Sequence, residues 1–467
     1  MTDADDPVTA GAMARATRDG ALRPTDLVER ALRRIEEIAP LNAFPLVDGE
    51  GARAEAARLE RLSAAERENM PLHGVPVAIK DFTPTAGHLT TRGSWSQNEV
   101  PTEDPVFVRR LKRAGAIIVG KTATPEFAYS SFTQSPRWGI TRNPHDPTRT
   151  PGGSSGGSAV AVATGCTPFA EGSDMGGSIR IPAALSGVVG LKPSLGRIPM
   201  DVLPGGSDFL SHFGPIAGCV DDAALFLSVT QGADDADYLS QAAVGPIDHP
   251  VAPADRSIRI AVSPDLGYYA IAPEVAARLD EVMAALKADG YRVERVELPW
   301  SRAINDAWSA LWGVALATSW GDALETHREY MDPAVVALIE AGRALDAVTA
   351  RHYEAVRHRL WADLAAVFRD YDVLLCPTCA RPAPKVDARD AGFEQDAPDG
   401  RYAGLDLCCP FNMVSACPAA SVPIGTAEGM PVGLQIVGRR FDDSTVLRLA
   451  KSVERLYPPK LAPIPRG

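Results

Sequence analysis

The sequence predicts an α/β protein, in which helices alternate with the strands of a central sheet. Short apolar runs at Val75–Ile79 and at 116–119 are typical of buried strands, and the stretch 105–114 between them has helical spacing. The same alternation of strand, helix and strand returns between residues 258 and 298. A length of 467 residues with 45% hydrophobic residues allows a large core, so the fold needs neither disulfides nor a metal.

The remaining elements follow from local patterns along the chain. A first helix is expected at 25–38, where Thr25 or Asp26 can cap the first turn. From there the patterns predict a helix at 50–64, a helix of small residues at 157–165, long helices across 302–370, a strand ending near Cys376, an irregular stretch at 377–403, strands near 419–423 and 432–437, and a last helix at 443–456. Since we find no internal repeat and no clear linker, one domain over residues 1–467 is expected.

Charge and terminal composition argue against several classes of protein. Lys and Arg number 47 and Asp and Glu number 59, a net charge of −12, so no basic excess is present to bind a nucleic-acid backbone. The acidic stretch Met1–Asp6 lacks the basic and apolar parts of a signal peptide. No apolar run is long enough to predict a membrane span. Seven cysteines, an odd number, indicate reduced thiols in a cytoplasmic protein.

Two short motifs match known patterns but stand in the wrong context. Residues Gly115–Thr122 fit GxxxxGK[ST], yet the residues between the glycines are expected to form a strand rather than a phosphate-binding loop. Residues Gly152–Gly156 fit GxSxG, yet the prolines before them exclude the buried strand that a nucleophile elbow requires. We therefore expect neither a nucleotide site nor an α/β-hydrolase elbow.

Cysteine and histidine do not form a convincing site either. Cys376 and Cys379 could hold zinc together with the pair Cys408–Cys409, but two thiols without a spacer suit a tetrahedral ion poorly. Buried packing residues are the simpler interpretation of these cysteines. The 8 histidines show no HxxxH or HExxH spacing and lie outside the glycine/serine segments. No metal and no cofactor are therefore expected.

What remains is one lysine and several serines in glycine-rich surroundings. Lys80 ends a predicted strand, Ser154 lies in one glycine loop, and Ser178 lies in another. The glycines within 175–178 let successive backbone N–H groups point into one cavity, which suits a developing oxyanion. Since no histidine is near, a lysine kept neutral by burial is the available base for a serine nucleophile. A flexible or phosphate-binding loop and a solvated lysine are the alternative interpretations.

These segments resemble those of the amidase signature hydrolases. Gly74–Asp81 resembles the segment with that family's catalytic lysine, Pro151–Ala159 its glycine/serine signature, and Gly172–Arg180 its nucleophile loop. Shorter matches follow at 141–144, 190–193, 213–215 and 431–436. The resemblance implies a single domain with a mixed central β-sheet covered on both faces by helices. It also implies a signature core at about 70–220 and a variable, substrate-shaping C-terminal half at about 255–410.

The resemblance further implies a role for each matching residue. Ser178 is the nucleophile, Ser154 on a cis peptide bond relays its proton, and Lys80 is the neutral base. The oxyanion hole consists of the backbone N–H groups of Met175, Gly176, Gly177 and Ser178, and the loops are supported by Ser155, Asp174 and Arg180. Ser173 and Met175 depart from the family's usual residues, but they keep the hydroxyl and the backbone N–H that these positions supply.

The expected activity is hydrolysis of a linear amide, with a small-molecule amide and water as the partners. The pocket walls are expected to come from three segments: 124–140 with its aromatic residues Phe127, Tyr129, Phe132 and Trp138, 200–213, and the irregular region 377–411. Such walls favour a hydrophobic or aryl amide, with esters or carbamates as side activities. A homodimer is an expectation by analogy, whereas nucleic acid and membrane are not expected as partners.

Two other functions fit the same motifs. The family also contains the glutaminase-type subunit of the tRNA-dependent amidotransferase, but residues 195–215 lack the Arg-Tyr-Gly run associated with that subunit. The second alternative is a catalytically silent binding protein on the same fold. The presence of Lys80, Ser154 and Ser178 together argues against it, because a scaffold needs none of the three.

Overall fold

The computed structural model describes residues 9–204, 206, 208–241 and 245–464. Its centre is an 11-stranded sheet in the order β1-β3-β2-β6-β8-β7-β12-β13-β11-β9-β10. The strands are β1 (Leu46–Val47), β2 (Pro76–Lys80), β3 (Ile117–Thr122), β6 (Phe169–Asp174), β7 (Val189–Lys192), β8 (His212–Ala217), β9 (Arg259–Val262), β10 (Arg292–Arg295), β11 (Val373–Pro377), β12 (Ala419–Ala427) and β13 (Met430–Gly438). A separate small sheet pairs β4 (Gln134–Ser135) with β5 (Gly139–Ile140).

The sheet is mixed, and its parallel part places two polar strand ends side by side. β2 runs parallel to β3 and to β6, with Ala78 opposite Ala170. Because parallel strands end at the same edge of a sheet, Lys80 at the end of β2 and Asp174 at the end of β6 emerge together. All residues of both strands are buried, so this edge lies inside the protein.

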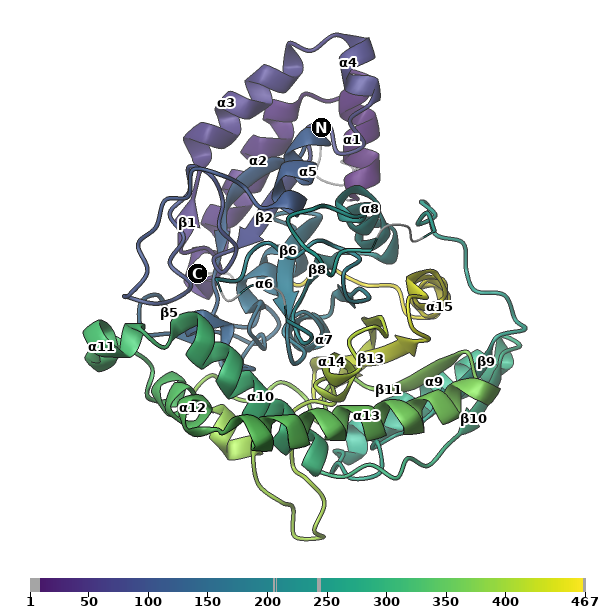
Figure 1. Ribbon diagram of the computed structural model, residues 1–467. Helices are drawn as coiled ribbons and strands as arrows, with labels where there is room; N and C mark the ends of the chain where they lie inside the picture. The colour runs from purple at the N-terminus through teal and green to yellow at the C-terminus, as the bar shows by residue number, and fades with distance from the viewer. Residues whose placement is uncertain (1–8, 205, 207, 242–244, 465–467) are drawn as a thin grey trace.

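Helices cover both faces of the sheet (Figure 1). They are α1 (Ala10–Arg18), α2 (Pro24–Glu37), α3 (Gly49–Glu60), α4 (Ala64–Glu68), α5 (Val106–Arg113), α6 (Gly156–Ala163), α7 (Arg180–Ser186), α8 (Val220–Thr230), α9 (Pro273–Ala288), α10 (Ala303–Trp320), α11 (Ala323–His327), α12 (Pro333–Ala344), α13 (Ala347–Asp370), α14 (Pro410–Met413) and α15 (Asp443–Leu456).

Alternate residues of one strand show the two layers. Val77 and Ile79 of β2 pack in the core cluster that includes α5, α8 and α15. Ala78, between them, packs with α6 and α7 on the other face. In Figure 1 the long helices α10, α12 and α13 lie together along the lower side, and the N-terminal helices α1–α4 lie at the opposite end. The predicted fold class, a mixed sheet covered on both faces by helices, is therefore confirmed.

Most predicted elements are present, with ends shifted by a few residues. Helices α2 and α9 and strands β2 and β11 stand where the periodicity predicts them. The segment from Phe169 to Thr230 differs, because it holds three strands and two helices that the sequence patterns did not indicate. Its three strands are buried along their whole length, so they lack the apolar–polar alternation on which such predictions depend. No helix within the described residues is long and apolar enough to cross a bilayer.

Candidate active site

Lys80 is the last residue of β2, and its side chain is completely buried. Its ammonium nitrogen Nζ lies 2.6 Å from Ser154 Oγ and 2.9 Å from Ser173 Oγ. Within the described part of the chain it forms no ion pair. Burial lowers the pKa of Lys80 to about 7, and the negative charges of Glu171 and Asp174 oppose only part of that shift. A buried lysine bonded to hydroxyl groups can thus be neutral at ordinary pH and can accept a proton.

Ser154 lies in the loop that precedes α6, and its side chain is also fully buried. The Gly153–Ser154 peptide bond is cis, as the family resemblance implied. A Cβ at Gly153 would lie 2.6 Å from the Ser130 carbonyl oxygen, so only glycine fits beside Ser154. The loop of Ser130 and the loop of Ser154 therefore pack closely. This packing holds the Ser154 hydroxyl next to the Lys80 ammonium nitrogen.

Ser178 lies in the loop between β6 and α7, where its side chain is partly exposed and lines a pocket. Its carbonyl oxygen accepts a hydrogen bond from the Ser155 N–H at 3.1 Å, which ties the two glycine loops together. The Ser173 N–H, near the end of β6, donates to Ser155 Oγ at 3.3 Å. Ser155 therefore bonds both to β6 and to the loop that carries Ser178. The fold therefore brings Lys80, Ser154 and Ser178, which are far apart in sequence, to one place.

The backbone N–H groups of 175–178 are divided between two tasks. The Gly177 N–H donates to Asp174 Oδ1 at 2.8 Å, so it is not free to bind a substrate oxygen. Among the hydrogen bonds of the described residues, the N–H groups of Met175, Gly176 and Ser178 have no acceptor. The structure thus corrects the expectation for Gly177. The reason is that the buried Asp174 carboxylate is its nearest strong acceptor.

Asp174 and Arg180 form a buried pair that shapes this loop. Arg180 donates to both carboxylate oxygens, from Nε at 2.9 Å and from Nη2 at 2.8 Å. Asn412 and Gln435 accept further hydrogen bonds from the same guanidinium. Burial alone would raise the pKa of Asp174, but the Arg180 charge and hydrogen bonds outweigh it and hold that pKa far below its usual range. Both residues therefore stay charged and hold the loop, in agreement with a supporting position.

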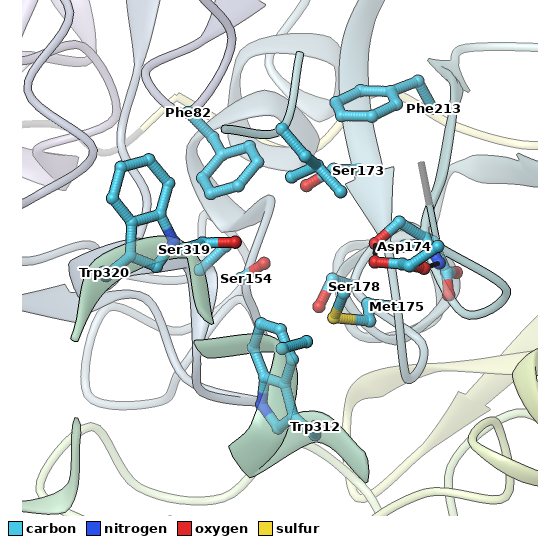
Figure 2. A pocket seen from close by; sticks show the side chains of 15 residues that line it. Phe82, Ser154, Ser173, Asp174, Met175, Ser178, Phe213, Trp312, Ser319 and Trp320 are labelled. Carbon is cyan, nitrogen blue, oxygen red and sulfur yellow. Dashed lines mark hydrogen bonds between the residues drawn. The ribbon is translucent and has the colours of Figure 1, made fainter. Parts of the chain in front are cut away.

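The pocket beside the serines is mostly apolar. It encloses about 450 Å³ including its open mouth, and its lining residues are Phe82, Ala128, Ser154, Ser173, Asp174, Met175, Ser178, Leu203, Asp208, Ser211, Phe213, Trp312, Ala315, Ser319 and Trp320. Figure 2 shows Ser154 and Ser178 facing the same space, with Trp312, Ser319 and Trp320 of α10 on its other sides. Aromatic walls around a few polar groups are typical of a site for a small organic molecule.

The predicted aromatic wall is not the observed one. Phe127 and Phe132 are buried outside the pocket lining, and Phe127 stacks on Trp320 with ring centroids 4.8 Å apart. The segment turns at Phe127 and Ala128, which both have positive φ, and only Ala128 reaches the pocket. Phe127 therefore supports the wall from behind rather than forming it.

The other two predicted wall residues are occupied elsewhere. The Tyr129 hydroxyl donates to Asp332 Oδ2 at 2.8 Å, at the start of α12. The Trp138 indole N–H donates to Thr91 Oγ1 at 2.8 Å. Neither Tyr129 nor Trp138 lines the pocket, because each side chain is held by a hydrogen bond to a residue that is not part of the lining.

Sequence reasoning missed the three tryptophans that α10 brings to the site. Trp312 and Trp320 line the pocket, and the Trp308 indole N–H donates to the Met175 carbonyl oxygen at 2.8 Å. Trp308 and Trp312 are four residues apart, which places them on one face of α10. Trp320 follows Trp312 by eight residues and lies beside that face. That spacing was the available signal. Gln435 lies in the matching segment 431–436, but the sequence did not indicate that it or Asn412 reaches Arg180, because that contact depends on the tertiary fold.

The motifs that were set aside also have a place in the fold. Residues 117–122 form strand β3, so the segment is not a phosphate-binding loop. All seven cysteines are free, and most of them are buried. In the described ranges, no three His, Cys, Asp or Glu side chains gather in a way that could hold a metal ion.

Comparison with known proteins agrees with this geometry. A family model described as Amidase matches residues 26–447. An acylamidase of Rhodococcus erythropolis is 36% identical over 466 residues, which cover 97% of this chain and 96% of that protein. A glutamyl-tRNA(Gln) amidotransferase component of Geobacillus thermodenitrificans (strain NG80-2) is 37% identical over 460 residues, covering 92% of this chain and 93% of that protein.

Solved structures show the same similarity. A bacterial aryl acylamidase of the amidase signature family superposes with a TM-score of 0.88 at 27% identity, covering 96% of each chain. The 6-aminohexanoate cyclic dimer hydrolase, solved with its substrate, has a TM-score of 0.85 at 29% identity and covers 97% of this chain and 99% of that one.

Proposed function

This chain belongs to the amidase signature family of amide hydrolases, and from this premise we propose that it cleaves small hydrophobic or aryl amides through an acyl-enzyme on Ser178. The observation that carries the proposal is the Lys80 ammonium nitrogen, which is buried without an ion-pair partner among the described residues and lies 2.6 Å from Ser154 Oγ. Ser178 lines the same pocket as Ser154, and we propose that the Ser154 hydroxyl links Ser178 to this base.

The proposed reaction has two acyl-transfer steps. Neutral Lys80 accepts the Ser154 proton while Ser154 accepts the Ser178 proton, and Ser178 Oγ attacks the amide carbonyl carbon. Unpaired N–H groups of the 175–178 loop stabilise the oxyanion of the tetrahedral intermediate. As the intermediate collapses, the C–N bond breaks and the proton returns through Ser154 to the leaving amine. Water then attacks the Ser178 ester by the same route, which releases the acid and the free enzyme.

The pocket supports the choice of substrate. Phe82, Trp312 and Trp320 supply aromatic surface, and Leu203 adds an aliphatic side chain. The similarity to an acylamidase and to an aryl acylamidase points in the same direction. We propose linear amides as the main substrates, with esters and carbamates as side activities because they share the carbonyl that Ser178 attacks.

Glutamine is a poorer fit to this pocket. Its α-carboxylate needs a cation, yet none of the described lining residues is Lys or Arg, and the carboxylates of Asp174 and Asp208 lie there instead. We therefore rank a glutaminase-type subunit second, in spite of the similarity to amidotransferase proteins.

The seven free cysteines support our further proposal of a cytoplasmic location.

A labelling experiment with a substrate panel tests the proposal. A serine-directed fluorophosphonate is expected to form a covalent adduct on Ser178, found by peptide mass spectrometry. Chromogenic anilides are expected to be hydrolysed faster than primary amides, carbamates or glutamine. A folded sample without an adduct and without turnover would support a silent binding protein. Turnover of glutamine alone, and only with partner proteins added, would support the role in an amidotransferase.

A further inference from the structure

Helix α10 belongs to the C-terminal half of the chain, far in sequence from the serines, yet one of its faces lies against the active site. Trp308, Trp312, Ala315 and Ser319 follow one another at helical spacing. The last three line the pocket, and Trp308 contacts the 175–178 loop itself. One rigid element therefore contacts both the loop that follows β6 and the pocket wall.

Trp308 holds a specific peptide group of that loop. Its indole N–H donates to the Met175 carbonyl oxygen at 2.8 Å, although the two residues are 133 positions apart. The ring also covers Gly176, because a Cβ built there would lie 2.2 Å from Trp308 Cζ2. The contact is thus both a hydrogen bond and a close packing contact, and it leaves no room for a side chain at 176.

The geometry of a peptide bond gives this contact a consequence. In a trans peptide the C=O of one residue and the N–H of the next point in opposite directions. Since the Met175 carbonyl oxygen accepts from the Trp308 indole, the Gly176 N–H must point away from that indole. It has no acceptor among the described residues. With two glycines following Met175, the backbone alone would leave this peptide free to rotate.

We propose that Trp308 is a positioning residue for the oxyanion hole, which orients the Gly176 N–H by holding the Met175 carbonyl; this inference rests on the acyl-enzyme mechanism proposed above. Asp174 fixes the next peptide through the Gly177 N–H. The loop is thus held by two contacts, one to the buried Asp174 carboxylate and one to Trp308 of α10. Helix α10 thus has two roles: its side chains shape the substrate pocket, and Trp308 orients the Gly176 N–H group.

Trp308→Phe is the direct test, because it removes the N–H and keeps an aromatic ring. Loss of a whole oxyanion donor costs about 10²–10³ in kcat, and a donor that only loses its orientation is expected to cost about tenfold. The affinity for an aryl trifluoromethyl ketone, whose hemiketal with Ser178 carries the oxyanion, is expected to fall by a similar factor. KM for the anilide should change by less than about twofold, since the oxyanion forms only after binding.

Trp300→Phe is the matched control. Trp300 is buried against Phe411, outside the pocket lining, and its indole nitrogen is one of the buried polar atoms of the described chain that lack a hydrogen-bond partner. Its substitution removes an N–H that makes no hydrogen bond, so kcat and ketone affinity should stay at the wild-type values.

A second variant, Trp308→His, keeps an N–H donor on a smaller ring and should retain more of kcat than the Phe variant. It also serves if the Phe variant does not fold.

The outcomes separate the two proposals. A fall in kcat with unchanged ketone affinity, or wild-type values for both Trp308 variants, overturns the role of Trp308 and leaves the amidase function intact. A wild-type protein that neither labels at Ser178 nor binds the ketone overturns the proposed function, and the role of Trp308 with it. Parallel losses in kcat and ketone affinity, absent in Trp300→Phe, support the inference.

Discussion

The catalytic floor and the α10 wall of the pocket are built in opposite ways. The floor, defined as Lys80, Ser154, Ser173 and Ser178, consists of hydroxyl and amine groups in glycine-rich segments, and Lys80 and Ser154 are fully buried. The wall, defined as Trp312, Ala315, Ser319 and Trp320, comes from a single helix and carries two tryptophans. Figure 2 shows Ser154, Ser173 and Ser178 of the floor around the same cavity as Trp312, Ser319 and Trp320 of the wall.

The difference shows which part of the site can vary. In the floor, Lys80 donates to both Ser154 and Ser173, so a change of any one of these three residues removes a hydrogen-bond partner of another. The wall acts mainly through shape, and an aromatic surface of another shape would still exclude water. Changes in the floor should therefore alter the rate for every substrate, and changes in the wall should alter the choice among substrates.

The largest expected effect is that of Ser178→Ala, which removes the nucleophile. We expect kcat to fall by about 10⁴–10⁶ for every amide and ester tested. Since Ser178 Oγ has no hydrogen bond within the described residues, the thermal unfolding midpoint should be close to that of the wild type. Initial rates on an anilide and an ester check the prediction. Retention of even one tenth of the activity would contradict the distinction between floor and wall.

Lys80→Met should have the next largest effect. It removes the base and keeps a side chain of similar length, and the expected loss in kcat is about 10²–10⁴ for all substrates. Lys121→Met is the matched control, since Lys121 is equally buried on the neighbouring strand but bonds to Thr83 and Thr85 rather than to the serines. Its rate per folded molecule should remain near that of the wild type. Equal losses in both variants would mean that buried charge, rather than the relay, is what matters.

Trp312→Leu tests the wall. The change enlarges the pocket at a side chain that is 7% exposed and lines it. We expect the ratio of kcat/KM between bulky and small acyl groups to shift by about 10–100-fold in favour of the bulky ones. Competition between two anilides in one reaction measures the ratio directly. A uniform loss on both substrates would show that the wall also serves the chemistry at this position.

The pH dependence tests the electrostatics of the floor. Because the active form of Lys80 is neutral and its pKa is about 7, kcat/KM should rise through pH 7 and fall about tenfold per pH unit below it. Glu171 accepts the Lys80 backbone N–H at 2.9 Å, and its negative charge favours the protonated lysine. Glu171→Gln removes that charge and should move the rise of kcat/KM to lower pH. A rise that stays at the same pH would mean that a group other than Lys80 controls it.

Chelation should have the smallest effect. Incubation with EDTA or phenanthroline is expected to change the rate by less than about twofold, because no residue assigned to the floor is a typical ligand for a transition metal. The same assay after addition of zinc tests Cys376 and Cys379, which are free and buried. A rate restored by zinc after chelation would give these cysteines a role beyond packing.

Much of the floor could be predicted from the sequence, and little of the wall. Lys80 ends an apolar run, and Ser154 and Ser178 lie in distinctive glycine segments, so local residue types carry the signal. Of the three segments expected to form walls, 200–213 does line the pocket, with Leu203 and Phe213 among its residues. In the aromatic segment 124–140, the turn at Phe127 and Ala128 instead places the Phe127 ring against Trp320, outside the pocket lining. Which face of a segment meets a cavity depends on its neighbours, and these are distant in sequence.

By itself, the sequence determined which chemical groups are available: a lysine at a strand end, two serines among glycines, and a sheet of alternating strands and helices. These follow from short-range rules of chain conformation and from the chemistry of single side chains. Only the tertiary structure decided that Gly177 donates to Asp174 and that Trp308 holds the Met175 carbonyl. Such contacts depend on the packing of distant elements in three dimensions, where the orientation of one peptide or one ring selects the partner.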